Sequence, residues 1–311
     1  MPTEPLKHIL DRDMSKVLGS NTIQLAAPLL RELVNDATNV FTRWLDSSKG
    51  EEDEDVPVLL SYLHIIEMTD AIEPLVLEAC TNPIIPCLRS SFEALLAIKY
   101  ILQSDYKTRS AAYMVGHVHR RMEMYELFDS DTPRGSDFQA DWEADEARGK
   151  MEEYNHTAIK QHAKKSILNL QNLLKKKTYI QAEQEYQKVK QLLHRKPEWY
   201  QLFGGPPNLR VLAERLNYRA RYDLLYRSWS NIAHAVDISR FITKTQDGKG
   251  AIKPLRNIDE LATVAGFAAW VMLEAKTLVL NKFHPGEESS VKKWYLSEIR
   301  QRYLGLYGHK V

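Results

Sequence analysis

The segment from Tyr222 to Asp237 holds the residues whose types and spacing are best suited to chemistry. Arg227 and His234 lie seven positions apart within it. Seven residues make about two helical turns, so the two side chains would share one side of a helix, roughly 10 Å apart along its axis. Arginine binds anions strongly, and histidine ionises near neutral pH and carries protons. The pair is therefore a candidate for an anion-binding group and a general acid–base.

The same segment has the pattern of an amphipathic helix. Four apolar residues recur at i, i+4, i+7 and i+11 and would stack against the core: Leu225, Trp229, Ile232 and Val236. The opposite face is polar. Beside Arg227 and His234, its candidate site residues are Tyr226, Ser230, Asn231 and Asp237. We expect Ser230 and Tyr226 to position a reacting group. Asn231 and Asp237 would support the site.

A second polar pair lies in the segment from Ile84 to Leu102. Arg89, Glu93 and Lys99 are its charged residues, among long apolar ones. A helix that is hydrophobic almost all round is usually buried, so Arg89 and Glu93, four positions apart, are expected to be poorly solvated neighbours. Buried charges need partners. Two interpretations stay open: an internal ion pair, or an arginine that Glu93 aims at a pocket.

These two helices are expected to pack together. Arg89 and Glu93 need polar partners, and the helix from Tyr222 offers the densest polar face in the chain. We therefore expect the pair to converge on one cluster with three further residues, which are Arg227, Ser230 and His234.

The sequence as a whole predicts an all-α protein, a bundle of about eight or more helices. Apolar residues recur at helical spacing, and no alternating segments indicate a series of strands. Residues 137–196 are rich in charge and poor in apolar positions, which predicts a long charged helical insertion that faces solvent. The expected domains are an N-terminal helical segment at 1–57, a core at 58–283 that contains the insertion, and a C-terminal helix at 284–311.

The composition favours a soluble cytoplasmic protein. Of 311 residues, 44% are hydrophobic, which is enough for a core, and the charged residues nearly cancel to +1. The N-terminus lacks the apolar run of a signal peptide, so the two cysteines are expected to be reduced. The longest apolar stretch, Leu261 to Leu273, is too short to span a bilayer before Glu274 follows. We expect no membrane association.

Neither a metal nor a cofactor is expected. Glu153 and His156 form a single Glu-x-x-His motif, whereas a di-metal helical bundle needs two such motifs and two more glutamates. The chain also lacks the glycine patterns that bind nucleotide phosphates and the spacing of a zinc site.

The two polar helices together resemble a bacterial all-helical domain family of unknown function. That family pairs an Arg-x-x-x-Glu helix with a Tyr-x-x-x-Tyr-x-x-x-Ser-x-x-x-His helix. The matching residues here are Arg89 and Glu93, then Tyr222, Tyr226, Ser230 and His234. The resemblance covers roughly residues 58–280 and implies an all-helical fold without an established activity.

The chain is more distantly similar to the HEPN superfamily (higher eukaryotes and prokaryotes nucleotide-binding). Ribonucleases of that superfamily carry an arginine, four to six residues, then a histidine on a late helix, and Arg227 and His234 enclose six. The resemblance implies that the arginine steadies the phosphate and that the histidine moves the 2′-hydroxyl or leaving-group proton without a metal. It also implies a homodimer whose two motifs face each other, near Tyr226 and Phe241.

Two functions remain open on the sequence. One is a HEPN-like, metal-independent endoribonuclease that acts on RNA, as a toxin or phage-defence effector, with Arg227, His234 and Ser230 as the catalytic residues. The other is a non-catalytic helical module that senses a ligand or binds a partner. In that module, Arg227 and His234 would belong to a buried structural hydrogen-bond network.

Overall fold

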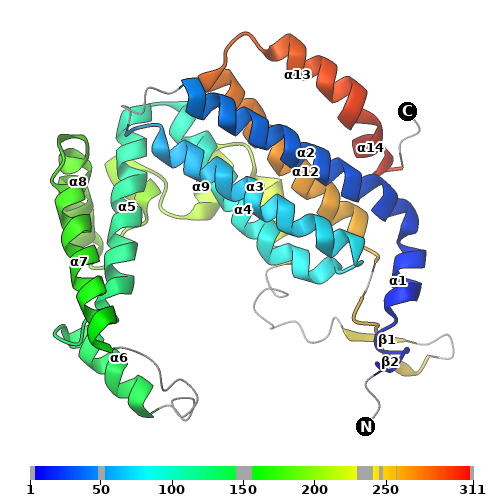
Figure 1. Cartoon of the computed structure of the whole chain (residues 1–311), viewed down its shortest axis with the longest axis horizontal. Coiled ribbons are helices and arrows are strands. Elements are labelled where there is room, and N and C mark those ends of the chain that lie inside the picture. Colours follow the sequence, from blue (N-terminus) through cyan, green and yellow to red (C-terminus); the bar gives the residue numbers. More distant parts are fainter. Residues whose placement is uncertain are drawn as a thin grey trace. The chain divides into compact units, whose positions relative to one another are not determined.

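A computed structural model of the chain describes residues 4–47, 53–144, 156–229, 241–244, 248–256 and 258–308, with only the backbone at Ser47, His156, Arg227 and Ser228. The fold is all-α, as predicted (Figure 1). The chain divides into two compact units. The first combines Met1–Ser104 with Arg210–Val311, and the second is Asp105–Leu209. The predicted division into 1–57, 58–283 and 284–311 stays a prediction.

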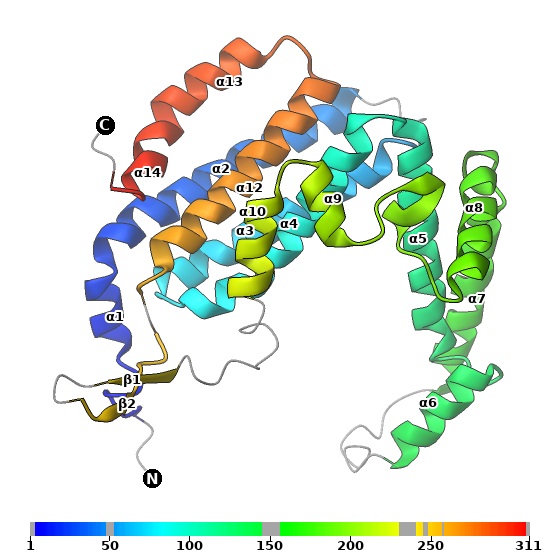
Figure 2. The ribbon, with the colours of Figure 1, turned by 180° about the vertical axis from the view of Figure 1, so that it is seen from behind.

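Four long helices form the centre of the first unit. They are α2 (Ser20–Ser47), α3 (Val56–Leu77), α4 (Thr81–Gln103) and α12 (Leu261–Phe283). Helix α3 runs along α4, and α12 packs against α2, α3 and α4 (Figures 1 and 2). Pro57 lies in the first turn of α3, where its missing N–H removes no helical hydrogen bond. Fully buried Tyr62 and Phe92 are the largest side chains of this core.

Helix α12 is long and apolar enough to cross a membrane by length and composition alone. However, 67% of its most apolar stretch is buried inside the protein, where three other helices cover it. A helix that is hydrophobic all round is usually a core helix when other helices surround it. The burial of α12 is therefore compatible with a soluble protein.

Shorter elements complete the first unit. They are α1 (Arg12–Leu18), α9 (Leu209–Arg215), α10 (Arg219–Asp223), the π-helical turn η3 (Leu224–Ser228), the strands β1 (Ile242–Lys244) and β2 (Gly250–Ile252), α13 (Glu288–Trp294), the π-helical turn η5 (Tyr295–Ile299) and α14 (Arg300–Gly305). The two strands pair antiparallel, with Ile242 opposite Ile252. They form a small ribbon at a place where the sequence indicates only a polar loop.

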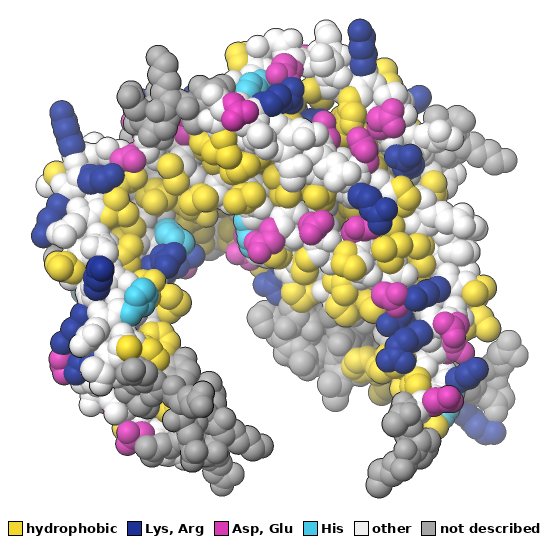
Figure 3. Space-filling model, viewed as in Figure 1, with side chains coloured by type: hydrophobic (Ala, Val, Ile, Leu, Met, Phe, Trp, Pro, Cys, Tyr) yellow, Lys and Arg dark blue, Asp and Glu magenta, His cyan; other side chains and the backbone are white. Residues whose placement is uncertain are grey.

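The outer face of α3 mixes apolar and acidic residues. Leu60 and Leu63 are exposed there, and Glu67 and Asp70 follow them at helical spacing. Figure 3 shows hydrophobic and acidic side chains intermixed over α3 and α4. The solvent-facing side of α3 is therefore acidic in part, and exposed leucines interrupt it.

The second unit is a helical hairpin packed on one long helix. It contains α5 (Tyr106–Glu126), α6 (Pro133–Ala144), α7 (His156–Leu174), α8 (Lys177–Leu193) and the 3-10 helix η2 (Trp199–Gly204). Helices α7 and α8 both pack on α5, and their sparse apolar residues supply a small core with Val115 and Tyr179. The charge-rich stretch therefore forms helices, as the sequence predicts.

A polar contact joins α5 to α8 inside the second unit. His119 Nε2 lies 2.7 Å from Glu183 Oε2, and the His119 ring stacks on Tyr186 with 3.9 Å between centroids. Burial alone would raise the pKa of Glu183, but hydrogen bonds from His119 and Gln187 outweigh it and hold that pKa below its usual value. These contacts hold α5 and α8 together, so they belong to the unit's internal structure.

Candidate functional site

The structure brings three of the predicted site residues together. Arg89 and Glu93 lie on α4, and Tyr226 lies on η3. The Arg89 Cζ atom is 4.4 Å from the centroid of the Tyr226 ring, within the range of a cation–π interaction. The Tyr226 hydroxyl donates a hydrogen bond to Glu93 Oε1. Two segments more than 130 residues apart in sequence therefore meet at the residues that the resemblance pairs.

The other predicted site residues lie wholly or partly outside the described part of the chain. The backbone of Arg227 continues η3 directly after Tyr226, but its side chain is outside the description. The remaining four lie outside the described residues, and they are Ser230, Asn231, His234 and Asp237. The convergence of Arg227, Ser230 and His234 on Arg89 stays a prediction.

Tyr222 extends the cluster along the chain. It lies in α10, one turn before Tyr226, and the two rings stack with 4.5 Å between centroids and 7° between planes. The sequence signal for this stack is the i, i+4 spacing, which places aromatic residues side by side on a helix. Tyr222 appears in the resemblance, but the residue pattern gave it no role.

The environment keeps the Tyr226 hydroxyl protonated. Burial raises the pKa of Tyr226 most, and the nearby carboxylate of Glu93 raises it further. The positive charge of Arg89 works in the opposite direction but does not cancel these effects. The hydroxyl is therefore a hydrogen-bond donor near neutral pH and is poorly suited to act as a base.

The prediction that Glu93 is poorly solvated is wrong. Its side chain is exposed, whereas Arg89 is half-buried. The reason lies in the helical positions, because Phe92, Leu95 and Leu96 face the core and turn Glu93 to the outer edge of α4. Replacing Arg89 would thus leave no buried carboxylate unpaired, and the large stability loss that such a charge causes is not expected.

A family model, described as a family of unknown function (DUF5677), matches residues 55–250. The chain belongs to this family. The DUF5677 match spans α3, α4, the second unit and η3, so it includes every predicted site residue. It confirms the predicted membership in a family of unknown function. No curated protein and no solved structure matches the chain.

A second polar cluster within the first unit fixes α10. Lys99 Nζ lies 2.6 Å from the Tyr218 hydroxyl and 3.3 Å from Glu274 Oε1, and the Tyr218 hydroxyl also donates to Glu274. The Arg221 guanidinium lies 4.1 Å from the Trp270 ring centroid. Glu274 and Trp270 belong to α12, outside the DUF5677 match. These contacts anchor the helix that carries Tyr222 on both α4 and α12.

Proposed function

We propose that the chain is a HEPN-like, metal-independent endoribonuclease, and that it acts as a toxin or phage-defence effector. The contact between Arg89 and Tyr226 supports this function most directly. It brings a cation from α4 beside the residue that precedes Arg227. Two arginines and a histidine from separate segments would then bind one phosphate, an arrangement that is suited to phosphate-ester cleavage.

The chemistry assigns a role to each residue. The 2′-hydroxyl attacks the neighbouring phosphorus, the P–O5′ bond breaks, and a 2′,3′-cyclic phosphate and a 5′-hydroxyl result. His234 accepts the 2′-hydroxyl proton or supplies one to the departing O5′ atom. Arg227 and Arg89 stabilise the negative charge that develops on the phosphate.

The remaining residues position the RNA and the histidine. Ser230 is a donor for the scissile group, and the Tyr226 hydroxyl, which donates its one proton to Glu93, can accept a hydrogen bond from the RNA. Asn231 and Asp237 orient the neighbouring side chains. The stacked rings of Tyr222 and Tyr226 present aromatic surface beside the cations, and nucleic-acid bases stack on such surfaces.

The direct test is incubation of the purified chain with total RNA in the presence of EDTA. We expect cleavage that EDTA does not reduce, with 2′,3′-cyclic phosphate at the new ends. The cyclic ends report attack by the 2′-hydroxyl and not by water. RNA that stays intact, or cleavage that disappears with EDTA, would contradict the proposal.

The proposal includes a symmetric homodimer. In HEPN ribonucleases two motifs face each other, so each copy here would contribute one Arg227 and one His234 to a shared groove. We expect sedimentation to give a dimer at micromolar concentration. A monomer under those conditions would count against the dimer while leaving the cleavage assay to decide the activity.

A second candidate function has its own support. The Tyr226 hydroxyl is already bonded to Glu93, and Arg89 already lies on the Tyr226 ring. Groups that satisfy one another in this way are typical of a structural network in a non-catalytic, ligand-sensing or partner-binding module. If RNA stays intact and substitution of His234 lowers the free energy of unfolding instead, the module is the better description.

A further inference from the structure

The C-terminal arm of the first unit, residues 288–305, lies along the central helices. It comprises α13, η5 and α14, and Figures 1 and 2 show it beside α2 and α12. Polar contacts attach it at its start and middle. Arg43 pairs with Glu287 at 3.1 Å, and the Trp294 indole N–H donates to Glu32 Oε1 at 3.0 Å. Helix α13 itself buries no residue completely, so its attachment leaves space beneath it.

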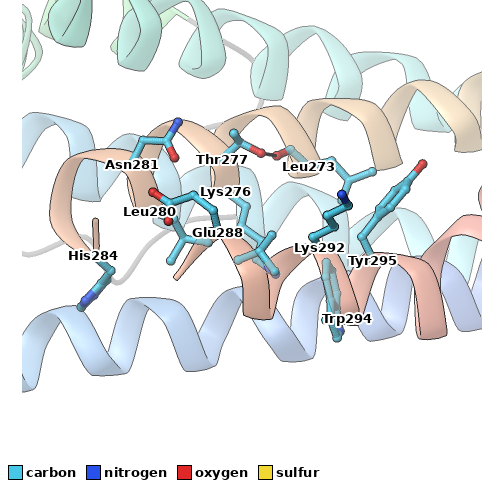
Figure 4. Close-up of a pocket in the computed structure, with 11 residues that line it drawn as sticks. Leu273, Lys276, Thr277, Leu280, Asn281, His284, Glu288, Lys292, Trp294 and Tyr295 are labelled. Carbon is cyan, nitrogen blue, oxygen red and sulfur yellow. Dashed lines mark hydrogen bonds between the residues drawn. The ribbon is translucent and has the colours of Figure 1, made fainter. Parts of the chain in front are cut away.

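That space is a pocket of about 340 Å³ between α12 and the arm (Figure 4). Its walls are mainly apolar and come from both sides: Leu273 and Leu280 from α12, Val291 and the Trp294 ring from the arm. Small-molecule sites usually have about 300–1,000 Å³, so this pocket has room for one small ligand. Its apolar lining favours an apolar ligand body.

One of the lining residues, Lys276, carries a positive charge that the protein itself neutralises. The Lys276 side chain is buried, and its ammonium group pairs with Asp36 on α2 and lies 3.3 Å from the Trp294 ring centroid. Its aliphatic stem therefore lines the pocket while its charge is neutralised elsewhere. A ligand is not needed to satisfy Lys276.

Two polar groups lie at one end of the pocket, the exposed Lys292 and the half-buried Tyr295. Lys292 and Tyr295 both line the pocket, at the end where Figure 4 places Leu273. Within the described part of the chain, neither side chain has a hydrogen bond or an ion pair. The acidic lining residue, Glu288, lies toward the other end, beside Asn281 (Figure 4). One end of an apolar pocket thus offers an ammonium and a hydroxyl to an anion.

We propose that this pocket binds a small amphiphile with an apolar body and a single anionic head group, such as a medium-chain carboxylate. The carboxylate accepts hydrogen bonds from Lys292 and from the Tyr295 hydroxyl, and the chain lies along Leu273, Leu280 and Val291. Burial of the chain drives binding, and the charged hydrogen bond fixes its direction. This site is independent of the proposed ribonuclease site.

The test is calorimetric titration of the full chain with decanoate below its micelle concentration, and with the neutral analogue 1-decanol. We expect one saturable decanoate site per chain. Lys292→Gln should weaken decanoate binding about three- to fivefold, because it removes an exposed charged hydrogen bond, and should leave decanol binding unchanged. Lys293→Gln is the matched control, since Lys293 is equally exposed but lies outside the pocket lining, and it should leave the binding of both ligands unchanged.

A second variant tests the location. Val291→Phe adds bulk inside the pocket on a half-buried position and should abolish binding of both ligands. The proposal is overturned if wild type shows no saturable decanoate binding, or if Lys292→Gln and Lys293→Gln weaken it equally. It is also overturned if the folded Val291→Phe variant binds decanoate as wild type does.

Discussion

Replacing His234 by alanine should lower the rate of RNA cleavage by about 10²–10⁴-fold, the usual contribution of a general acid–base. The reason is chemical, because alanine can neither accept the 2′-hydroxyl proton nor supply one to the leaving oxygen. His234 lies on the polar face that the sequence predicts, so we expect the melting temperature of His234→Ala to stay near that of wild type. Initial rates on one labelled RNA, measured with EDTA present, give the comparison.

The chain contains a matched control for this variant. Arg302 and His309 repeat the arginine–histidine spacing of Arg227 and His234 near the C-terminus. His309→Ala therefore removes a histidine of the same motif in another place, and it should leave the cleavage rate unchanged. Equal rates for His234→Ala and wild type would assign the cleavage to a contaminant or to other residues. A loss of cleavage in both variants would contradict the assignment of His234 as the general acid–base.

Most of the fold follows from the spacing of apolar residues. The segment Ile84–Leu102 is expected to be a buried helix, and the structure has α4 from Thr81 to Gln103. Likewise, the long apolar stretch from Leu261 to Leu273 becomes the first part of α12, although the helix continues to Phe283. Long periodic segments specify a helix strongly, whereas their ends depend on local hydrogen bonds that the pattern does not show.

The helix that begins at Tyr222 departs from the expectation in a specific way. The sequence predicts a regular α-helix, but the structure has α10 up to Asp223 and then the π-helical turn from Leu224 to Ser228. A π-helical turn needs i→i+5 hydrogen bonds, and no residue type in the sequence predicts it. Such turns are frequent at functional sites, and this one carries Tyr226, the residue that contacts Arg89.

The sequence predicts which two segments meet at the candidate site, but it does not predict the contacts between their side chains. Apolar surroundings indicate that Arg89 needs a partner, and the polar face after Tyr222 is the best one in the sequence. The sequence does not show that this partner is an aromatic ring, because cation–π geometry depends on how α4 and η3 pack. The exposure of Glu93 depends on the same packing.

The partner of Lys276 is also not predictable from the sequence. Its position inside the long apolar helix α12 indicates a buried charge that must be paired. Its partner, Asp36, lies 240 positions earlier in the sequence, on α2, where it looks like any other acidic residue of an amphipathic helix. Only the packing of α2 against α12 identifies the pair.

Replacing Lys276 by methionine should lower the free energy of unfolding of the first unit by about 3 kcal/mol. Lys276 is 3% exposed, and its ammonium group is held by Asp36 and the Trp294 ring. Burial lowers the pKa of Lys276, and the hydrogen bond and charge of Asp36 oppose that shift. Methionine keeps most of the volume of the side chain but leaves the largely buried Asp36 carboxylate without its cation.

The decisive comparison is the double variant Asp36→Leu with Lys276→Met. Replacing both members of a buried pair by apolar residues removes the stranded charge, so the double variant should regain most of the loss. Lys282→Met on the exposed end of the same helix is the control, and we expect it to stay within about 0.5 kcal/mol of wild type. Urea unfolding followed by tryptophan fluorescence measures all four proteins. If the double variant is less stable than Lys276→Met alone, the loss comes from packing around the lysine stem and not from an unpaired carboxylate.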